Sequence, residues 1–528
     1  MSAWTRRRLL GALSSLAVAG LPGCARPFLK PSPPAPAPGG LPPLIDAHCH
    51  LFNATDLPVA RFAQIVLLKD YQHRGPQKWW ERALAAALRD IEDLLQGGVL
   101  RASEEANPEA RPLLEPTMAL SADAEMKLKQ RQRDAERALA ASDGMDAAAA
   151  CKQSGKLSPS LESIVGWIRT LRSSRAGLTA ALRDANAASG YQSSLLCPAL
   201  VDYSNWIEED LASPLPDQVR ALGTLAARAD LPPVHGYVAF DPLRAALLRH
   251  GSATLGGSWD PFRIAEEALL DNGFLGVKLY PPMGFRPGGN AGSRQGYPPR
   301  IEDTFGGSEA VSAALDEALE DLWAFCLKHD APVLAHAANS VGAGPDYSRR
   351  ADPAYWLPVA TKHPELRILL AHFGRFDSYS AGHERVDDCD PPFGATWEAA
   401  FGRFVAERRD CRLYADISYL SDIFTPKDRA RARRGMEAYL KLDPGGRHLV
   451  YGSDWVMLGI EKAYPGGGGY PHRVARFLAE CGLSPGEVRG IMRDNAIRCL
   501  GLTAESGARK RILSFYAKNG LPAARLPG

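Results

Sequence analysis

Two histidines near the start of the predicted folded region have the spacing of metal ligands. His48 and His50 stand in the segment LIDAHCH, residues 44–50, with one residue between them. Alternate side chains of a β-strand point to the same side, so the two imidazoles are expected about 6–7 Å apart along the backbone. At that spacing both rings can converge on one ion. Imidazole nitrogen is a common zinc ligand, so the pair predicts a metal site at the end of a strand.

Three further residues able to ligate a metal follow other short apolar segments. His336 lies in APVLAHAAN, His372 in LRILLAHFG and Asp454 in RHLVYGSDW. Taken singly, each has an ordinary structural explanation, because a histidine can be satisfied in a core and an aspartate can cap a helix. Together with the two histidines of the first segment, they place five ligand-type residues at matching ends of four predicted strands. This coincidence indicates one shared metal site.

The part of the chain that must position these residues alternates apolar segments with helical stretches. Helical periodicity covers 308–329 and 426–442, for example, and eight segments have the composition of strands: 44–50, 194–203, 232–240, 273–281, 331–339, 366–374, 411–419 and 447–455. This alternation predicts an α/β fold, a (β/α)8 TIM barrel whose reactive groups lie at the carboxyl ends of the strands. An open doubly wound sheet is the alternative, but no GxGxxG or GxxxxGK[ST] motif follows the first strand.

Residues 1–24 have the pattern of an export signal. The arginines at 6–8 precede an apolar run too short to span a bilayer and resemble a twin-arginine signal. The following LPGC resembles a lipoprotein box, which predicts a lipid anchor to a membrane at Cys24. Pro22 departs from the usual box, so ordinary cleavage nearby is the alternative. We therefore expect an exported protein of the bacterial cell envelope, in the periplasm or as a membrane-anchored lipoprotein.

The remaining chain divides by composition. Residues 25–43 form a Pro-rich linker, 44–507 the predicted barrel, and 508–528 a C-terminal tail. Helix-forming sequence fills about 56–190, which predicts a large helical insertion after the first strand. The net charge of +2 gives no electrostatic reason to expect nucleic-acid binding, so the expected partner is a small-molecule substrate. The sequence carries no signal of the oligomeric state.

The motif set resembles the amidohydrolase superfamily of metal-dependent hydrolases, in particular the branch that contains carboxymuconate-semialdehyde decarboxylase. The matching segments IDAHCH, VKLYP, VLAHAA, ILLAHFG, YGSDW and IMRDNAIRCLGL follow the order of the family over about 44–502, apart from the insertion. The resemblance implies four metal ligands: His48, His50, His336 and Asp454.

Two further residues have alternative roles under this resemblance. His372 corresponds to a ligand of a second metal or to a general acid or base, and Lys278 to a carboxylated bridge between two metals. A substrate contact or a salt-bridged barrel lysine is the alternative for Lys278. We expect one Zn²⁺ per chain, while two metals, or another divalent ion such as Mn²⁺ or Fe²⁺, are the alternatives.

The resemblance implies a metal-dependent hydrolase. Zinc lowers the pKa of a bound water to about 7, and the resulting hydroxide attacks an amide, lactone or ester carbonyl of a small substrate. Asp454 accepts the proton, and His372 or the metal stabilises the oxyanion. A decarboxylase using the same site, or a non-catalytic metal-binding envelope lipoprotein, is the alternative. Weaker candidates for substrate contact are Arg375, Arg286 and His73.

Overall fold

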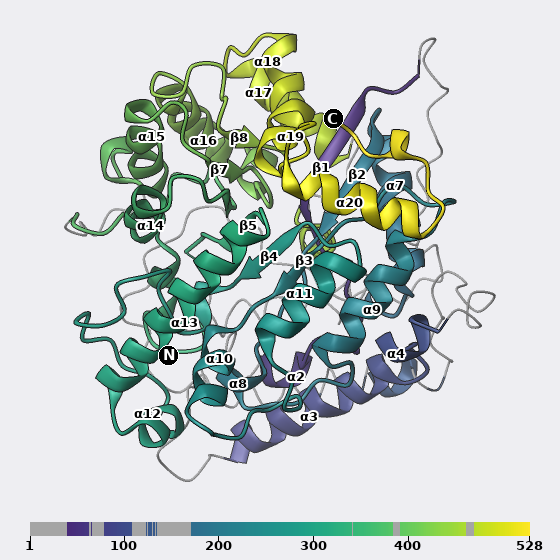
Figure 1. Ribbon diagram of the computed structural model, residues 1–528, viewed down its shortest axis with the longest axis vertical. Coiled ribbons are helices and arrows are strands. Elements are labelled where there is room, and N and C mark those ends of the chain that lie inside the picture. The colour runs from purple at the N-terminus through teal and green to yellow at the C-terminus, as the bar shows by residue number, and fades with distance from the viewer. Residues whose placement is uncertain are drawn as a thin grey trace.

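The computed structural model describes residues 40–62, 65, 79–107, 123, 125–128, 130–131, 134, 170–339, 342–383, 391–460 and 469–528. Within these ranges, strands lie at the centre and helices surround them (Figure 1). The export signal and Cys24 lie outside the described residues. Among the described helices, none has both the length and the apolar character needed to cross a bilayer.

The strands of the described chain pair only in parallel with their sequence neighbours. Strands β3 to β8 form one six-stranded sheet in sequential order, and β1 and β2 form a second. The strands are β1 (Pro43–Cys49), β2 (Gln192–Pro198), β3 (Tyr237–Ala239), β4 (Gly276–Leu279), β5 (Val333–His336), β6 (Ile368–Ala371), β7 (Leu413–Asp416) and β8 (Leu449–Val450). Each lies within or overlaps one of the eight predicted segments.

The two sheets meet at both edges without forming one continuous ladder. Isolated parallel bridges join β2 to the chain around β3, through Leu196 with Val234 and Ala199 with Tyr237. At the other edge, the Ala47 amide donates to the Tyr451 carbonyl at 3.0 Å. Strand β8 has only two residues, so regular pairing does not continue across this edge. The barrel prediction is therefore confirmed in part: parallel strands occur in the predicted order, in two sheets rather than one closed barrel.

Helices fill most of the connections between strands. Local sequence explains several helix starts, because the helices that begin at Pro242, Pro261 and Pro426 each start with proline after a side chain that caps the first turn. The helices that follow β2 are α8 (Ser204–Ile207), α9 (Leu215–Ala226), α10 (Pro242–Arg249), α11 (Pro261–Asp271), α12 (Pro299–Phe305), α13 (Ser308–Lys328), α14 (Trp356–Lys362), α15 (Trp397–Glu407), α16 (Pro426–Tyr439), α17 (Tyr470–Glu480), α18 (Pro485–Arg489), α19 (Asn495–Cys499) and α20 (Gly507–Lys518). The predicted helices over 308–329 and 426–442 correspond to α13 and α16.

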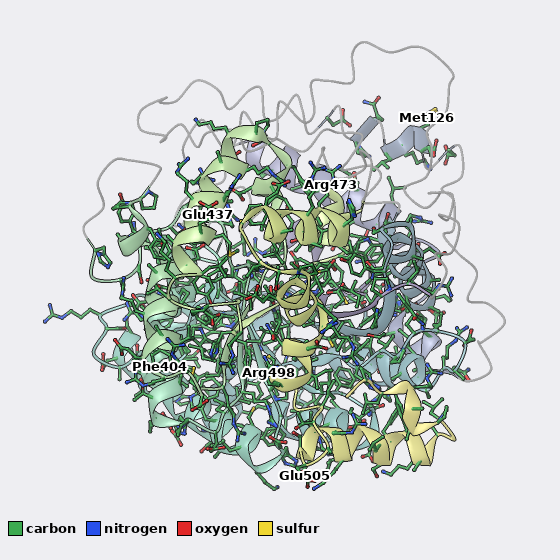
Figure 2. All side chains as sticks on the ribbon, turned by 90° about the horizontal axis from the view of Figure 1, so that it is seen from above. Met126, Phe404, Glu437, Arg473, Arg498 and Glu505 are labelled. Atoms are coloured by element: carbon green, nitrogen blue, oxygen red, sulfur yellow. The ribbon has the colours of Figure 1, made fainter. Side chains whose placement is uncertain are left out.

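Two apolar layers hold these elements together. The inner layer contains one side chain or more from most strands, among them Leu334, Leu369 and Tyr414, and it is continued by Phe515 and Tyr516 of α20. The outer layer packs the opposite strand faces against the helices. Figure 2 shows side chains filling the space between ribbons, while Met126, the most exposed large apolar side chain described, lies at the rim of the view.

The described part of the segment between β1 and β2 is mainly helical. It contains α2 (Val59–Phe62), α3 (Trp79–Gln96), α4 (Ala102–Glu105) and α7 (Arg175–Ala188). Arg175 is buried between the carboxylates of Asp56 and Glu105, and this ion cluster ties α4 and α7 to the chain that leaves β1. Most of 108–169 lies outside the described residues, so the helical insertion over 56–190 as a whole stays a prediction.

Candidate metal centre

Strand alternation directs three chemically active side chains to one side of the six-stranded sheet. In β4, Val277 and Leu279 pack in the outer layer, so Lys278 between them points inward. The same alternation turns His336, at the end of β5, to the side of Leu334. It likewise turns Asp416, at the end of β7, to the inner side. The carboxyl ends of these strands therefore bring a lysine, a histidine and an aspartate to one region.

Two further residues reach this region through an unusual backbone conformation. His372 and Asp454 follow β6 and β8 with φ angles of 71° and 54°, in the left-handed region that side chains other than glycine rarely adopt. In β6, Leu370 packs in the outer layer, so regular alternation would send His372 outward as well. The left-handed turn reverses that direction. Such backbone strain is typical of functional sites, where the surrounding structure maintains it.

Three of the predicted ligands form a compact buried group. Ligand atoms of His48, His50 and Asp454 all lie within 4.8 Å of one another. The Oδ1 atom of Asp454 is 3.1 Å from Nε2 of His50 and 3.6 Å from Nε2 of His48. Two ligands bonded to one tetrahedral zinc at about 2.0–2.1 Å would be about 3.3 Å apart, so this spacing fits a shared ion.

The hydrogen bonds around His50 show that this group suits a cation. Nδ1 of His50 lies 2.8 Å from the carbonyl oxygen of Ala199, which can only accept, so Nδ1 carries a proton. In the neutral ring, Nε2 then presents a lone pair to the Asp454 carboxylate. With Nε2 unprotonated, this nitrogen and the carboxylate oxygen are two acceptors 3.1 Å apart, an arrangement that a divalent cation between them would stabilise. The imidazole nitrogens of His48 and His50 and the carboxylate of Asp454 therefore fit a divalent metal.

Asp416 orients His48 for the same role. Its Oδ2 accepts from Nδ1 of His48 at 3.1 Å, which leaves Nε2 of that ring as the ligating nitrogen. Its Oδ1 accepts the backbone amides of His372 and Ser418, both at 3.0 Å. The Ser418 hydroxyl lies 3.1 Å from Nδ1 of His48 and 2.9 Å from Nδ1 of His372. A second group with metal-ligand spacing, His48, His372 and Asp416, is therefore already connected by internal hydrogen bonds.

Asp46 fastens the two segments that carry the first group. It is fully buried and accepts both the backbone amide and the hydroxyl of Ser453, at 2.9 and 2.6 Å, beside Asp454. The His48 amide also donates to it, at 3.4 Å. Burial raises the pKa of Asp46 to about 7, against the hydrogen bonds from Ser453 that lower it. The aspartate of LIDAHCH thus links β1 to the turn after β8.

The other predicted residues surround this group. Nδ1 of His336 lies 3.0 Å from Nε2 of His372, so one of these rings donates to the other, and the ring of His372 is 5.1 Å from that of His48. Nζ of Lys278 lies 3.3 Å from Nε2 of His48. The described clusters with ligand spacing do not include His336. Its role as a ligand stays a prediction.

Burial sets the charge of these groups. It lowers the pKa of His48, His336 and His372, which are therefore neutral at physiological pH and keep a lone pair for a metal. Burial also lowers the pKa of Lys278 to about 8, although Asp416 and Asp454 oppose this change. Burial acts to raise the pKa of Asp454, but its contacts with the surrounding imidazoles, among them a hydrogen bond with His50, hold it below its ordinary value.

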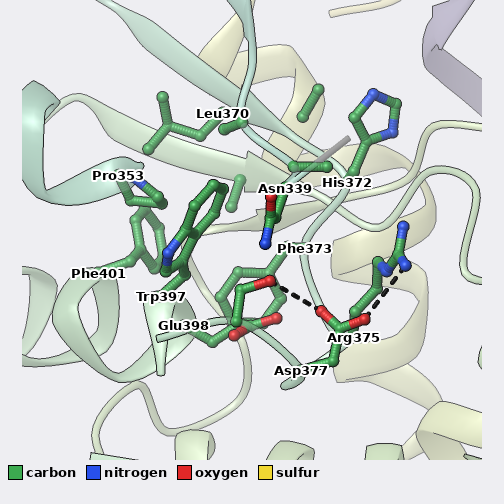
Figure 3. A pocket seen from close by; sticks show the side chains of 15 residues that line it. Asn339, Pro353, Leu370, His372, Phe373, Arg375, Asp377, Trp397, Glu398 and Phe401 are labelled. Carbon is green, nitrogen blue, oxygen red and sulfur yellow. Dashed lines mark hydrogen bonds and ion pairs between the residues drawn. The ribbon is translucent and has the colours of Figure 1, made fainter. Parts of the chain in front are cut away.

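The candidate substrate residues have separate positions. Arg375 lines a pocket beside His372, where its Nη2 donates to Oδ2 of Asp377 at 3.1 Å (Figure 3). The Arg286 guanidinium lies over the Tyr355 ring, 4.4 Å from its centre, and is not among the residues that line this pocket. His73 lies outside the described residues.

Sequence reasoning gave incomplete roles to several residues around the centre. Asp416 and Ser418 end the seventh predicted strand, and this position alone does not distinguish a substrate contact from support of a ligand. Asp46 stands two residues before His48 on the same strand, a spacing that indicates a shared side. Glu398, inside α15, carries no such signal, since a glutamate within a helix is usually solvent-exposed.

Comparison with known proteins adds one substantial match. The family model described as amidohydrolase matches residues 215–502, more than half of the chain. A search of curated proteins gives no match.

Similar solved structures are remote. A protein described as a metal-dependent hydrolase, from Lactobacillus casei ATCC 334, has 13% identity over 89% of this chain and 96% of that one, with a TM-score of 0.39. An amidohydrolase with bound zinc, from Burkholderia multivorans, has 14% identity over 58% and 83%, with a TM-score of 0.34. A uronate isomerase from Bacillus halodurans C-125 has 10% identity over 96% and 98%, with a TM-score of 0.35. At this similarity they carry no argument, and the assignment depends on the family match.

Proposed function

Because the chain belongs to the amidohydrolase family, we propose that it is a metal-dependent hydrolase that cleaves an amide, lactone or ester bond of a small molecule. The observation that carries the proposal is the buried group of His48, His50 and Asp454, whose ligand atoms all lie within 4.8 Å of one another. We propose a single divalent ion, zinc, at this group, with His336 completing the ligand set. Asp416 and Ser418 are assigned to positioning, since their polar atoms already bond the ligand histidines.

A divalent ion bound here supplies Lewis acidity and a water of lowered pKa. The chain supplies the proton transfers. Asp454 is a carboxylate at neutral pH, so it can accept a proton from the attacking water and return it to the leaving group. His372 is neutral, and its Nδ1 and Nε2 already lie within hydrogen-bond distance of the Ser418 hydroxyl and of Nδ1 of His336, so donation to a developing oxyanion requires it to exchange one of these partners. The Lys278 ammonium, beside His48, offers a further donor to a substrate oxygen.

The test is the metal content of the chain purified without chelator. We expect about one zinc per chain in the wild type and a large loss in His50→Ala and Asp454→Ala, because each variant removes one of the buried ligands. Lys278→Ala should retain the metal, since a single-ion site needs no lysine bridge. His472→Ala is the matched control, because His472 is exposed on α17.

The contrary results are equally specific. No metal after reconstitution of the wild type, or full metal in both ligand variants, would overturn the proposal. Two ions that depend on Lys278 would instead assign the bridged two-metal site. Screening amides, lactones and esters, with detection of released CO2 from carboxylated compounds, then separates hydrolysis from decarboxylation.

We also propose that the protein is exported to the bacterial cell envelope and anchored through Cys24. The support is the arginine-rich start, the short apolar run and the LPGC segment of the sequence. Cell fractionation of the wild type and Cys24→Ser checks this proposal. Retention of the full-length chain in the cytoplasm would contradict export, and equal membrane association of the two forms would contradict the lipid anchor.

A further inference from the structure

A narrow, half-open pocket lies next to the metal centre. His372 belongs both to the centre and to the wall of this pocket. Figure 3 shows Trp397, Phe401 and Pro353 on one side of it, and Arg375 with Asp377 on the other. The pocket therefore combines an apolar, aromatic side with a charged side.

Glu398 is the unusual member of this lining. Its side chain is buried, with 6% of its surface exposed. Oε1 accepts the Phe376 amide at 2.7 Å, whereas Oε2, also buried, has no hydrogen-bond partner among the described residues. A buried carboxyl oxygen without a partner costs free energy, commonly about 1–3 kcal/mol. A bound ligand that donates to this oxygen would remove that cost.

The charges around Glu398 indicate the sign of such a ligand. Arg375 is paired with Asp377, so the positive charge of this arginine is already offset. His372 is neutral because burial lowers its pKa. With Glu398 ionised, the charges of the four residues Arg375, Asp377, His372 and Glu398 sum to one net negative charge. Burial and the nearby Asp377 raise the pKa of Glu398 to about 7, and the groups that oppose this change are backbone amides rather than a cation.

The aromatic side indicates the shape of the ligand. Trp397 is fixed by its indole N–H, which donates to the Tyr379 carbonyl at 2.7 Å, and it is nearly buried. Phe373 and Phe401 lie in T-shaped contact, with ring centres 5.6 Å apart. Rigid aromatic surfaces bind flat apolar groups and also attract cations through their π faces.

We propose that this pocket binds a planar organic cation, such as an amidinium, with its positive nitrogen on Glu398 and its flat body against Trp397. Resting on the proposed function, the pocket then holds the positively charged part of a substrate whose scissile carbonyl reaches the metal centre. The substrate class is a small amide, lactone or ester that carries a planar nitrogen cation.

The test measures binding of two probes of nearly equal shape by isothermal titration calorimetry. Benzamidine is a planar cation, and benzamide is its neutral counterpart. We expect saturable benzamidine binding to the wild type, and weakening by about tenfold or more in Glu398→Gln, because a hydrogen bond to a charged group is lost. Benzamide should bind at least about tenfold more weakly than benzamidine to the wild type, for the same reason.

Two further variants make the result specific to the pocket. Glu407→Gln, at the exposed end of the same helix α15, should bind benzamidine like the wild type. Trp397→Phe, which keeps an aromatic ring, should weaken benzamidine severalfold, and it tests the pocket even where Glu398→Gln fails to fold. Equal benzamidine affinity in the wild type and Glu398→Gln, or equal affinity of the wild type for both probes, would overturn the proposal.

Zinc analysis of the same preparations separates this inference from the proposed function. Benzamidine binding without zinc would support the pocket and reject the metal-dependent hydrolase. Bound zinc without benzamidine binding would support the metal-dependent hydrolase and reject the proposed cation pocket.

Discussion

Glu398 makes the stability of the fold depend on pH. Burial raises the pKa of its carboxyl from an ordinary 4.5 to about 7 in the folded chain. Between these two values the folded protein keeps a proton that the unfolded chain has lost, so the free energy of unfolding falls as the pH rises through this window. The difference between the two pKa values, multiplied by 1.36 kcal/mol per pH unit, gives a loss of about 3 kcal/mol in the free energy of unfolding.

Glu398→Gln removes this titration while keeping the shape of the side chain. We expect the variant to gain stability relative to the wild type by about 2–3 kcal/mol between pH 5 and pH 8. Asp377 and Arg375, the charged neighbours in the pocket, are present in both proteins, so the comparison reports the change at position 398.

Urea unfolding followed by circular dichroism, without benzamidine or other cations of that class, measures the difference at pH 5, 6, 7 and 8. Glu407→Gln serves as the control and should follow the wild type at each pH. A stability gap between Glu398→Gln and the wild type that stays constant over this range would refute the reasoning, since it would mean that Glu398 titrates alike in the folded and unfolded chains.

Other predictions test the supports of the centre and the fold. Asp416→Asn should lower zinc affinity about 10–100-fold in a chelator competition, because the acceptor that orients His48 is weakened, whereas exposed Asp410→Asn should not. Gly435→Ala should cost about 1–3 kcal/mol in urea unfolding, since a Cβ there overlaps a phenylalanine ring, while Gly486→Ala has open space and should cost little. Arg175→Met should cost about 3–5 kcal/mol, because it leaves two buried carboxylates unpaired; a loss below 1 kcal/mol would contradict that account.

The ligand-type residues could be recognised from the sequence because their signals are local. His48 and His50 share a side of one strand through a two-residue period, and apolar segments mark where each strand ends. The order of the parallel strands also followed from the alternation of strand and helix patterns. Closure of the barrel could not be predicted from the sequence, because the two-residue length of β8 depends on how the elements pack.

Other features depend on contacts between distant parts of the chain. The direction of the His372 side chain results from a left-handed backbone angle of 71°, and strand periodicity predicts the opposite side. The pairing of Arg375 with Asp377 offsets a charge that the sequence presents as available for substrate. Glu398 looks like a solvated helix residue until the packing of α15 buries it beside Trp397.

The sequence by itself therefore determined which residue types lie at the strand ends, because side-chain periodicity and apolar segments are properties of neighbouring residues. The tertiary structure alone decided which nitrogen of His48 and of His50 can bind a metal, and which carboxyl oxygen of Glu398 lacks a hydrogen-bond partner among the described residues. Those properties depend on hydrogen bonds and burial created when strands and helices far apart in the chain come together.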